Sequence, residues 1–169
     1  MAGTRAYGGS GIGGLIRRGE LANGIPARPG GRGATWRDEQ ERPGGNPFVW
    51  PANAADAGYA TTYATSGNVY MGSLLAIPPA VDIAAIGLGT SGPGYQIARA
   101  LQDYGAYVVD ATSDNMNFYI EPAAASEIPP AIDGLVSTAI QYVQVVTNNG
   151  PSTVGGGGTP RRPLAPPTQ

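Results

Sequence analysis

Residues 81–110 read VDIAAIGLGTSGPGYQIARALQDYGAYVVD, and this stretch decides the fold. An apolar run over 81–86 leads into a glycine-rich turn, and Ser91 is a residue type that caps the first turn of a helix. Apolar side chains then recur at helical spacing on one face, at Ile97, Ala98, Leu101 and Tyr104. The pattern predicts a first strand, a helix over 92–104 and a second strand over 106–110.

The same glycine-rich turn permits a nucleotide-binding interpretation. Gly87, Gly89 and Gly92 have the spacing of a dinucleotide-binding turn, and Asp110 follows where an acid binds the ribose hydroxyls. Asp82, however, interrupts a strand that should be wholly apolar in such a domain. A dinucleotide-binding βαβ domain therefore stays a competing hypothesis, and it requires that the two strands beside the helix pair in parallel. The alternative is a glycine-rich loop before an ordinary amphipathic helix.

Further strands and a second helix are expected outside this stretch. Apolar runs over 48–50 and 69–77 are typical of strands, and 117–120 is expected to form an antiparallel hairpin with 106–110. Apolar residues at helical spacing predict another helix over 130–147. We therefore predict an α+β fold. Its sheet is small, mainly antiparallel and β-sandwich-like, with two packed helices and irregular ends rich in glycine and proline.

Glycine and proline also divide the chain into regions. The 169 residues include 27 Gly and 16 Pro, which are concentrated at the two ends, as in low-complexity segments. We expect a flexible arm rich in Gly, Arg and Pro over 1–47, a folded α+β core over 48–149 and a tail over 150–169. Within the arm, residues 27–47 have almost no apolar content and are predicted to be a disordered loop.

The composition excludes several kinds of functional site. The chain has no Cys and no His, which rules out disulfides, thiolate sites, Ser-His triads and the commonest metal ligand. We predict no cofactor and no metal site. No apolar run approaches the roughly 18 residues of a membrane span, and no signal-peptide core follows Met1.

Charge is spread unevenly, although the net charge is only −2. Residues 1–55 hold seven Arg and four acidic residues, whereas residues 56–150 hold one Arg and eight acidic residues. A basic arm beside an acidic core favours self-association or contact with a polyanion, although solvated loop arginines explain the same pattern. Nucleic acid is not an expected partner.

Several blocks of the sequence resemble one protein family. The blocks are GSGIGGLIRRGEL (9–21), VWPANAADA (49–57), MGSLLAIPPAVDI (71–83), ALQDYGAYVVD (100–110) and VVTNNGPSTVGGGGTP (145–160). They are similar to the C-terminal half of a family of secreted bacterial proteins that are frequent in actinobacteria and have no established activity. The resemblance implies an extracellular, β-rich module. It also implies a partial version of a larger fold, because the family's additional N-terminal half has no counterpart here.

One departure from the family pattern follows Pro26. The family typically continues with His-Ala-Leu in a strand, whereas this chain has Ala27-Arg28-Pro29. The codons CAC-GCC-CTN, read one base out of frame behind a G, give GCA-CGC-CCT, which encodes Ala-Arg-Pro. We hypothesise that residues 27 to about 47 are a frame-shifted stretch. An undisturbed frame in the resequenced source DNA would refute this hypothesis.

Aromatic side chains carry the leading functional hypothesis. Trp50, Tyr59, Tyr63 and Tyr70 are candidates for a sugar-stacking surface, because flat amphipathic rings suit that role. Half-buried packing explains the same residues. We predict a non-enzymatic extracellular module, structural or glycan-binding, whose partner is a polysaccharide or another protein chain.

A carbohydrate-active enzyme, either a glycoside hydrolase or a lyase, is the alternative. A hydrolase needs two carboxyl groups roughly 5 to 9 Å apart, one of them with a raised pKa. Asp110 and Asp114 flank the predicted hairpin, while Glu20 and Glu121 lie elsewhere in the sequence. Sequence spacing brings no two of these acids together, so catalysis stays an open question at this point.

Overall fold

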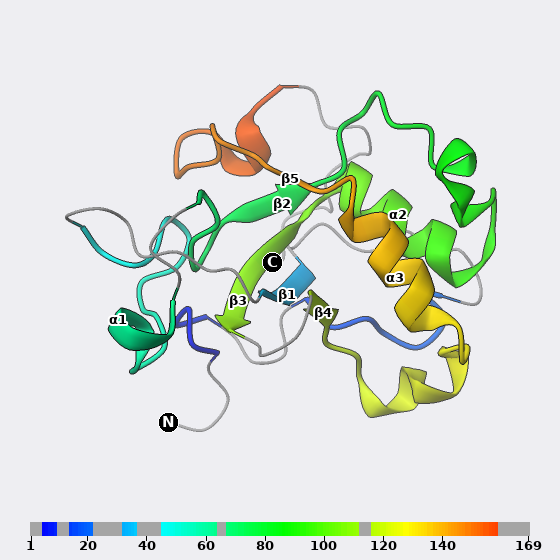
Figure 1. Ribbon diagram of the computed structural model, residues 1–169, viewed down its shortest axis with the longest axis horizontal. Coiled ribbons are helices and arrows are strands. Elements are labelled where there is room, and N and C mark those ends of the chain that lie inside the picture. Colours follow the sequence, from blue (N-terminus) through cyan, green and yellow to red (C-terminus); the bar gives the residue numbers. More distant parts are fainter. Residues whose placement is uncertain are drawn as a thin grey trace, which may run out of the picture.

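The computed structural model describes residues 5–9, 14–21, 32–36, 45–63, 67–111 and 116–158. The strands in these ranges form one mixed five-stranded sheet (Figure 1). They are β1 (Arg32–Trp36), β2 (Leu74–Ala76), β3 (Ala106–Ala111), β4 (Asn117–Phe118) and β5 (Gln144–Val145). The helices are α1 (Tyr59–Thr62), α2 (Gly92–Asp103) and α3 (Ile132–Ile140), with short helical turns η1 (Ala84–Leu88), η2 (Pro122–Glu127) and η3 (Val154–Gly156).

Strand β3 is the centre of the sheet, whose order is β4-β1-β3-β2-β5. It pairs in parallel with β1 and antiparallel with β2, while β4 pairs antiparallel with β1 and β5 antiparallel with β2. The predicted α+β fold with a mainly antiparallel sheet is confirmed. The described strands make a single sheet, and α2 and α3, side by side in Figure 1, form the layer beside it.

Helix α2 agrees with its prediction. It begins at Gly92 and ends at Asp103, and Ile97, Ala98 and Leu101 of its apolar face are buried in the core. Gly105 follows with φ of +71°, the left-handed conformation that ends helices. The chain then enters β3 directly, so that the helix packs back onto the strands next to it.

Helix α3 is shorter than the predicted 130–147, because β5 replaces its second half. The helix ends at Ile140, and Gln144–Val145 pairs with β2, extended by a hydrogen bond from Val146 N to Leu74 O (2.9 Å). Val143, Val145 and Val146 are β-branched, and the open edge of β2 offers them backbone partners. The pairing with β2 therefore overrides the helical spacing.

The apolar run over 81–86 is not a strand, contrary to the prediction. Asp82 Oδ1 accepts hydrogen bonds from the amides of Ala84 (2.9 Å) and Ala85 (3.4 Å), which starts the short helical turn η1. Ile83 and Leu88 are buried, so the run still contributes to the core. The aspartate in the run is a helix-starting residue here, which explains why no strand forms.

The predicted hairpin between 106–110 and 117–120 is also wrong, because β1 lies between its two strands. Thr35 is in register with Asp110 of β3 on one side and with Asn117 of β4 on the other. Strand β1 belongs to the range that was predicted to be a disordered loop. Its backbone pairs on both sides, and that pairing does not depend on side-chain type. The rest of 27–47 lies mostly outside the described residues, and the frame-shift hypothesis stays a prediction.

The packed part of the molecule begins before residue 48, within the range predicted to be a flexible arm. Ile16 and Leu21 are only 2% and 3% exposed, and Ile16 forms a β-bridge with Ile120. Nearer the N-terminus, Tyr7 N donates to Val109 O (3.2 Å) and Tyr7 O accepts from Asn53 N (3.1 Å). This N-terminal segment therefore lies against the end of β3.

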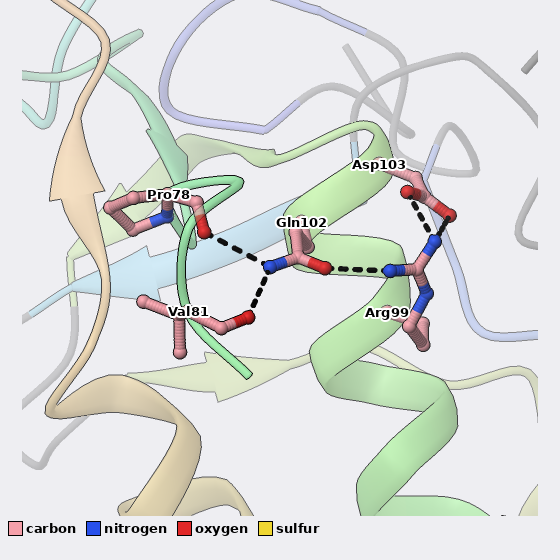
Figure 2. A network of polar contacts seen from close by, with 5 residues as sticks. All are labelled: Pro78, Val81, Arg99, Gln102 and Asp103. Carbon is pink, nitrogen blue, oxygen red and sulfur yellow. Dashed lines mark hydrogen bonds and ion pairs between the residues drawn. The ribbon is translucent and has the colours of Figure 1, made fainter. Parts of the chain in front are cut away.

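A buried polar network fixes the turn after β2 to helix α2 (Figure 2). Gln102 Nε2 donates to the carbonyl oxygens of Pro78 (3.0 Å) and Val81 (2.9 Å). Its Oε1 accepts from Arg99 (2.6 Å), and the Arg99 guanidinium also pairs with both oxygens of Asp103 (2.8 and 2.9 Å). These contacts satisfy polar groups at the edge of the core, so the network is structural.

Candidate functional site

The four aromatic candidates do not form one surface. Tyr59 and Tyr63 lie in and next to α1, with ring centroids 6.1 Å apart. Tyr63 is only 8% exposed, and its hydroxyl donates to Asp56 Oδ2 (2.7 Å). Trp50 and Tyr70 instead line a cleft beside β2 and β5. The structure thus separates the predicted stacking surface into two pairs, and the second pair lines a cleft.

The cleft beside Trp50 and Tyr70 has a volume of about 200 Å³ and an uncharged lining. Its polar side chains are Asn68, Ser73, Thr147 and Asn149, and its apolar side chains are Val49, Leu74, Val145 and Val146. Two aromatic rings with a few hydrogen-bonding groups are the usual composition of a small-molecule site. The cleft can therefore hold a small uncharged ligand with both apolar and hydroxyl groups.

Tyr107 of β3 supports this cleft. Its ring packs edge-on against Trp50, with centroids 6.4 Å apart and an interplanar angle of 85°. Its hydroxyl donates to Asn149 Oδ1 (3.2 Å), which also accepts from Gly155 N (2.9 Å). Burial raises the pKa of Tyr107 above its ordinary value of 10.0, and the hydrogen bond with Asn149 acts in the opposite direction. Through Tyr107, strand β3 contacts two lining residues of the cleft, Trp50 and Asn149.

Asn149 and Asn68 are site residues that sequence reasoning missed. Asn149 lies in an Asn-Asn-Gly-Pro run, which indicated only the end of a helix. Asn68 follows Gly67 in a segment that reads as a loop. Nothing in the local pattern links either residue to Trp50, because the cleft forms only when β5 pairs with β2. No sequence signal marked them as part of a site.

A second group of polar side chains surrounds Asp110 near the end of β3. Tyr119 donates to Asp110 Oδ2 (3.1 Å), and the guanidinium of Arg5 lies 3.5 Å from the centroid of the Tyr119 ring. The pKa of Asp110 is raised above its ordinary value of 3.8, chiefly by burial and further by the negative charge of Asp56. Tyr119 and Arg5 act in the opposite direction. Asp56 is therefore an acidic residue whose charge acts on Asp110.

The carboxylate candidates among the described residues lie in two places: Asp110 is hydrogen-bonded to Tyr119, whereas Glu20 and Glu121 are at a turn. Asp114 lies outside the described residues. Glu20 and Glu121 lie together at a turn, where they accept hydrogen bonds from the amides of Arg17 (2.9 Å) and Arg18 (2.6 Å). Glu127 Oε1 accepts from the next amide, that of Gly19 (2.7 Å). These three glutamates hold the turn in place, and sequence spacing predicted neither this grouping nor the effect of the Asp56 charge on Asp110.

The dinucleotide-binding hypothesis lacks the strand pairing on which it depends. It requires 81–86 to pair in parallel with 106–110, but 81–86 is not a strand and β3 pairs with β1 and β2. Gly87 and Gly92 have positive φ angles and open space where a Cβ would lie, and Gly89 also has a positive φ. The three glycines therefore provide the positive φ angles at which the chain bends before and at the start of α2. Asp110 is engaged with Tyr119, as described above.

Two other hollows in the described residues suit a sugar less well. A groove of about 440 Å³ beside β4 is mainly apolar, and its lining includes Ile16, Met116 and Phe118, with Asp133 as the charged residue. A hollow of about 350 Å³ beside the 79–84 turn contains Arg99, whose guanidinium is already paired with Asp103. Neither lining contains a pair of aromatic rings beside neutral hydrogen-bonding groups. The cleft beside Trp50 is therefore the best candidate site.

The described residues also bear on two other kinds of structure, a metal site and a membrane-spanning helix. No group of three or more acidic side chains in these ranges is arranged to hold a metal ion. No helix within them combines the length and the apolar character that crossing a membrane requires.

Comparison with known proteins adds no relative. No family model, curated protein or solved structure matches the chain. The resemblance to the secreted bacterial family therefore stays a prediction, as does the extracellular location that it implies. The features of the chain that bear on function are the cleft beside Trp50 and the polar group around Asp110.

Proposed function

We propose that this protein is a non-enzymatic, extracellular glycan-binding module whose site is the cleft beside Trp50 and Tyr70. The observation that carries the proposal is the composition of the cleft, which places two aromatic rings beside uncharged amide and hydroxyl groups. A sugar has an apolar C–H face that packs on an aromatic ring and a rim of hydroxyls that exchange hydrogen bonds with such groups. The partner is a polysaccharide.

Ligand titration of paired variants tests the proposal. Purified protein is titrated with soluble oligosaccharides, and binding is followed by tryptophan fluorescence and calorimetry. Trp50→Ala is expected to abolish binding, since the ring forms a wall of the cleft. Tyr59→Ala is the matched control, because Tyr59 belongs to the other aromatic pair. Binding lost in Tyr59→Ala and kept in Trp50→Ala would place the sugar site at α1 and refute the assignment to the cleft.

The Asp110 group favours one second candidate function, a carbohydrate-active enzyme. A general acid must be protonated at its working pH, and the raised pKa of Asp110, to which the charge of Asp56 contributes, is a property that such catalysis uses. Tyr63 and Tyr119 hold the two carboxylates by hydrogen bonds (2.7 and 3.1 Å).

Hydrolysis assays separate the two functions. Activity would be measured as reducing ends released from polysaccharides and as phenol released from aryl glycosides, over a range of pH. Activity that disappears in both Asp110→Asn and Asp56→Asn would establish the enzyme. Sugar binding without turnover in the unchanged protein would leave the binding module.

A further inference from the structure

We infer that Asn149 determines the specificity of the cleft, by donating its amide hydrogens to an acceptor oxygen of a single uncharged sugar unit. The inference rests on the proposed glycan-binding function and adds two features to it. One is the class of ligand, which is neutral and small. The other is the group that recognises the ligand.

The orientation of the Asn149 carboxamide follows from its hydrogen bonds. Gly155 N can only donate, so the atom that it contacts at 2.9 Å must be the carboxamide oxygen. Tyr107 donates to the same oxygen at 3.2 Å, and both lone pairs of Oδ1 are then used. The Nδ2 amide group, with its two hydrogens, is therefore the part of the side chain left to contact a ligand.

Nδ2 is available for such a contact. Within the described residues Nδ2 donates no hydrogen bond to another protein atom, and it is not fully buried. It is thus open to water on a residue that lines the cleft. The bonds from Tyr107 and Gly155 leave the side chain little freedom to rotate. A pre-oriented donor of this kind discriminates strongly against ligands without the matching acceptor.

The lining of the cleft sets the charge of the ligand. Its ten residues are all uncharged, so a bound carboxylate or sulfate would lose water without gaining a counter-ion. A neutral sugar should lose less, because its hydroxyls can exchange hydrogen bonds with Asn68 and Thr147, whereas Ser73 is buried and its hydroxyl accepts from Tyr70 N (2.8 Å). We therefore expect neutral glycosides to bind and uronates to be excluded.

The volume of the cleft sets the size of the ligand. About 200 Å³ lies below the range of roughly 300–1,000 Å³ that is usual for pockets that enclose drug-sized molecules. The cleft is therefore matched to one sugar ring. A longer glycan would bind by one unit, with the rest of the chain outside.

The test uses the full chain and a panel of four methyl glycosides, those of glucose, galactose, N-acetylglucosamine and glucuronic acid. Binding is measured by calorimetry and by the NMR signals of side-chain amides in ¹⁵N-labelled protein. A neutral glycoside is expected to bind and to shift the Asn149 side-chain signal, while the glucuronide does not bind. Asn149→Asp keeps an oxygen for Gly155 N and Tyr107 but removes the donor, and should weaken neutral-sugar binding by about tenfold.

The outcomes distinguish this inference from the proposed function. A neutral glycoside that binds the unchanged protein and Asn149→Asp equally, without moving the Asn149 signal, overturns the role of Asn149 and leaves the glycan module standing. Equal binding of the glucuronide overturns the selection for neutral sugars. Failure of every glycoside and longer oligosaccharide to bind the unchanged protein overturns both proposals. If Asn149→Asp does not fold, the side-chain signal of the unchanged protein decides the question without a variant.

Discussion

The Tyr107 hydroxyl donates a hydrogen bond to Asn149 Oδ1 at 3.2 Å, and so joins the central strand β3 to the segment that follows β5. The ring of the same tyrosine packs edge-on against Trp50. Tyr107 is thus a positioning residue for two lining residues of the cleft, Trp50 and Asn149. Its ring contacts Trp50 and its hydroxyl binds Asn149, so a substitution that removes only the hydroxyl tests the second contact separately.

Tyr107→Phe keeps the ring against Trp50 and removes the bond to Asn149. We expect the free energy of unfolding to fall by about 1 kcal/mol, which is typical for one partly buried hydrogen bond. We also expect neutral-sugar affinity to fall several-fold, because Asn149 is then held only by Gly155 N. Urea unfolding and calorimetric titration measure the two effects. Tyr142→Phe, at an exposed position, is the control. Unchanged affinity in Tyr107→Phe would contradict the positioning role.

Gln102→Ala should destabilise the fold without touching the cleft. The substitution removes the donor to the carbonyls of Pro78 and Val81 and the acceptor for Arg99 (Figure 2). We expect a loss of about 1–3 kcal/mol in the free energy of unfolding, because polar groups at the edge of the core lose their partner. Gln141→Ala, an exposed position after α3, should change it by less than about 0.5 kcal/mol. Equal effects in urea unfolding would show that the network is not structural.

Asp110→Asn should change how stability depends on pH. Because the pKa of Asp110 is raised in the folded protein, the folded state binds more protons than the unfolded state between the ordinary value of 3.8 and the raised value. Its contribution to stability is therefore present at low pH and is lost as pH rises through that window. The asparagine variant should gain thermal stability relative to the unchanged protein as pH rises above 3.8.

Thermal unfolding at a series of pH values measures this difference. Asp133→Asn, which removes a charge at an exposed position on α3, is the control for net charge. The comparison needs only the difference in melting temperature between each variant and the unchanged protein. A difference for Asp110→Asn that stays constant with pH would mean that Asp110 has an ordinary pKa in the folded state.

Local signals account for the parts of the fold that sequence predicted. Helix α2 follows from a proline in its first turn, an apolar face with a period of 3.6 residues and a terminal glycine, all within one short stretch. Ser91 is at the N-cap position, but its side chain makes no capping hydrogen bond. The strand over 106–110 follows from its β-branched residues. These features act between residues close in sequence, and tertiary contacts did not override them.

Pairings distant in sequence account for what prediction missed. Strand β1 has few β-forming residues and is defined by its neighbours on both sides, β3 and β4. The charge of Asp56 acts on Asp110, which is distant in sequence, and Asn149 reaches Tyr107 only because β5 pairs with β2. The aromatic candidates were divided into two pairs for the same reason. Residue type identified Trp50 and Tyr70 as candidates, but only the fold identifies the neutral amides beside them.

Alanine substitution of two glycines separates backbone strain from steric clash. Gly87 and Gly105 both have positive φ angles, of +87° and +71°. A Cβ at Gly87 would meet nothing within 4 Å, whereas at Gly105 it would lie 2.7 Å from Leu75 O and 2.8 Å from Leu74 Cδ1. Gly87→Ala should cost about 1–2 kcal/mol from left-handed strain alone. Gly105→Ala should cost a further 1–3 kcal/mol or so, because β2 must shift away from the helix end.

Gly134→Ala completes this series with the opposite sign. Gly134 lies inside α3, has no positive φ and has open space at its Cβ. Alanine there should stabilise the protein by about 0.5–1 kcal/mol, because glycine is a poor helix former. Urea unfolding of the three variants should give the order Gly134→Ala, unchanged protein, Gly87→Ala and Gly105→Ala, from most to least stable. Equal losses at Gly87 and Gly105 would mean that the close approach of β2 to the end of α2 is absent in solution.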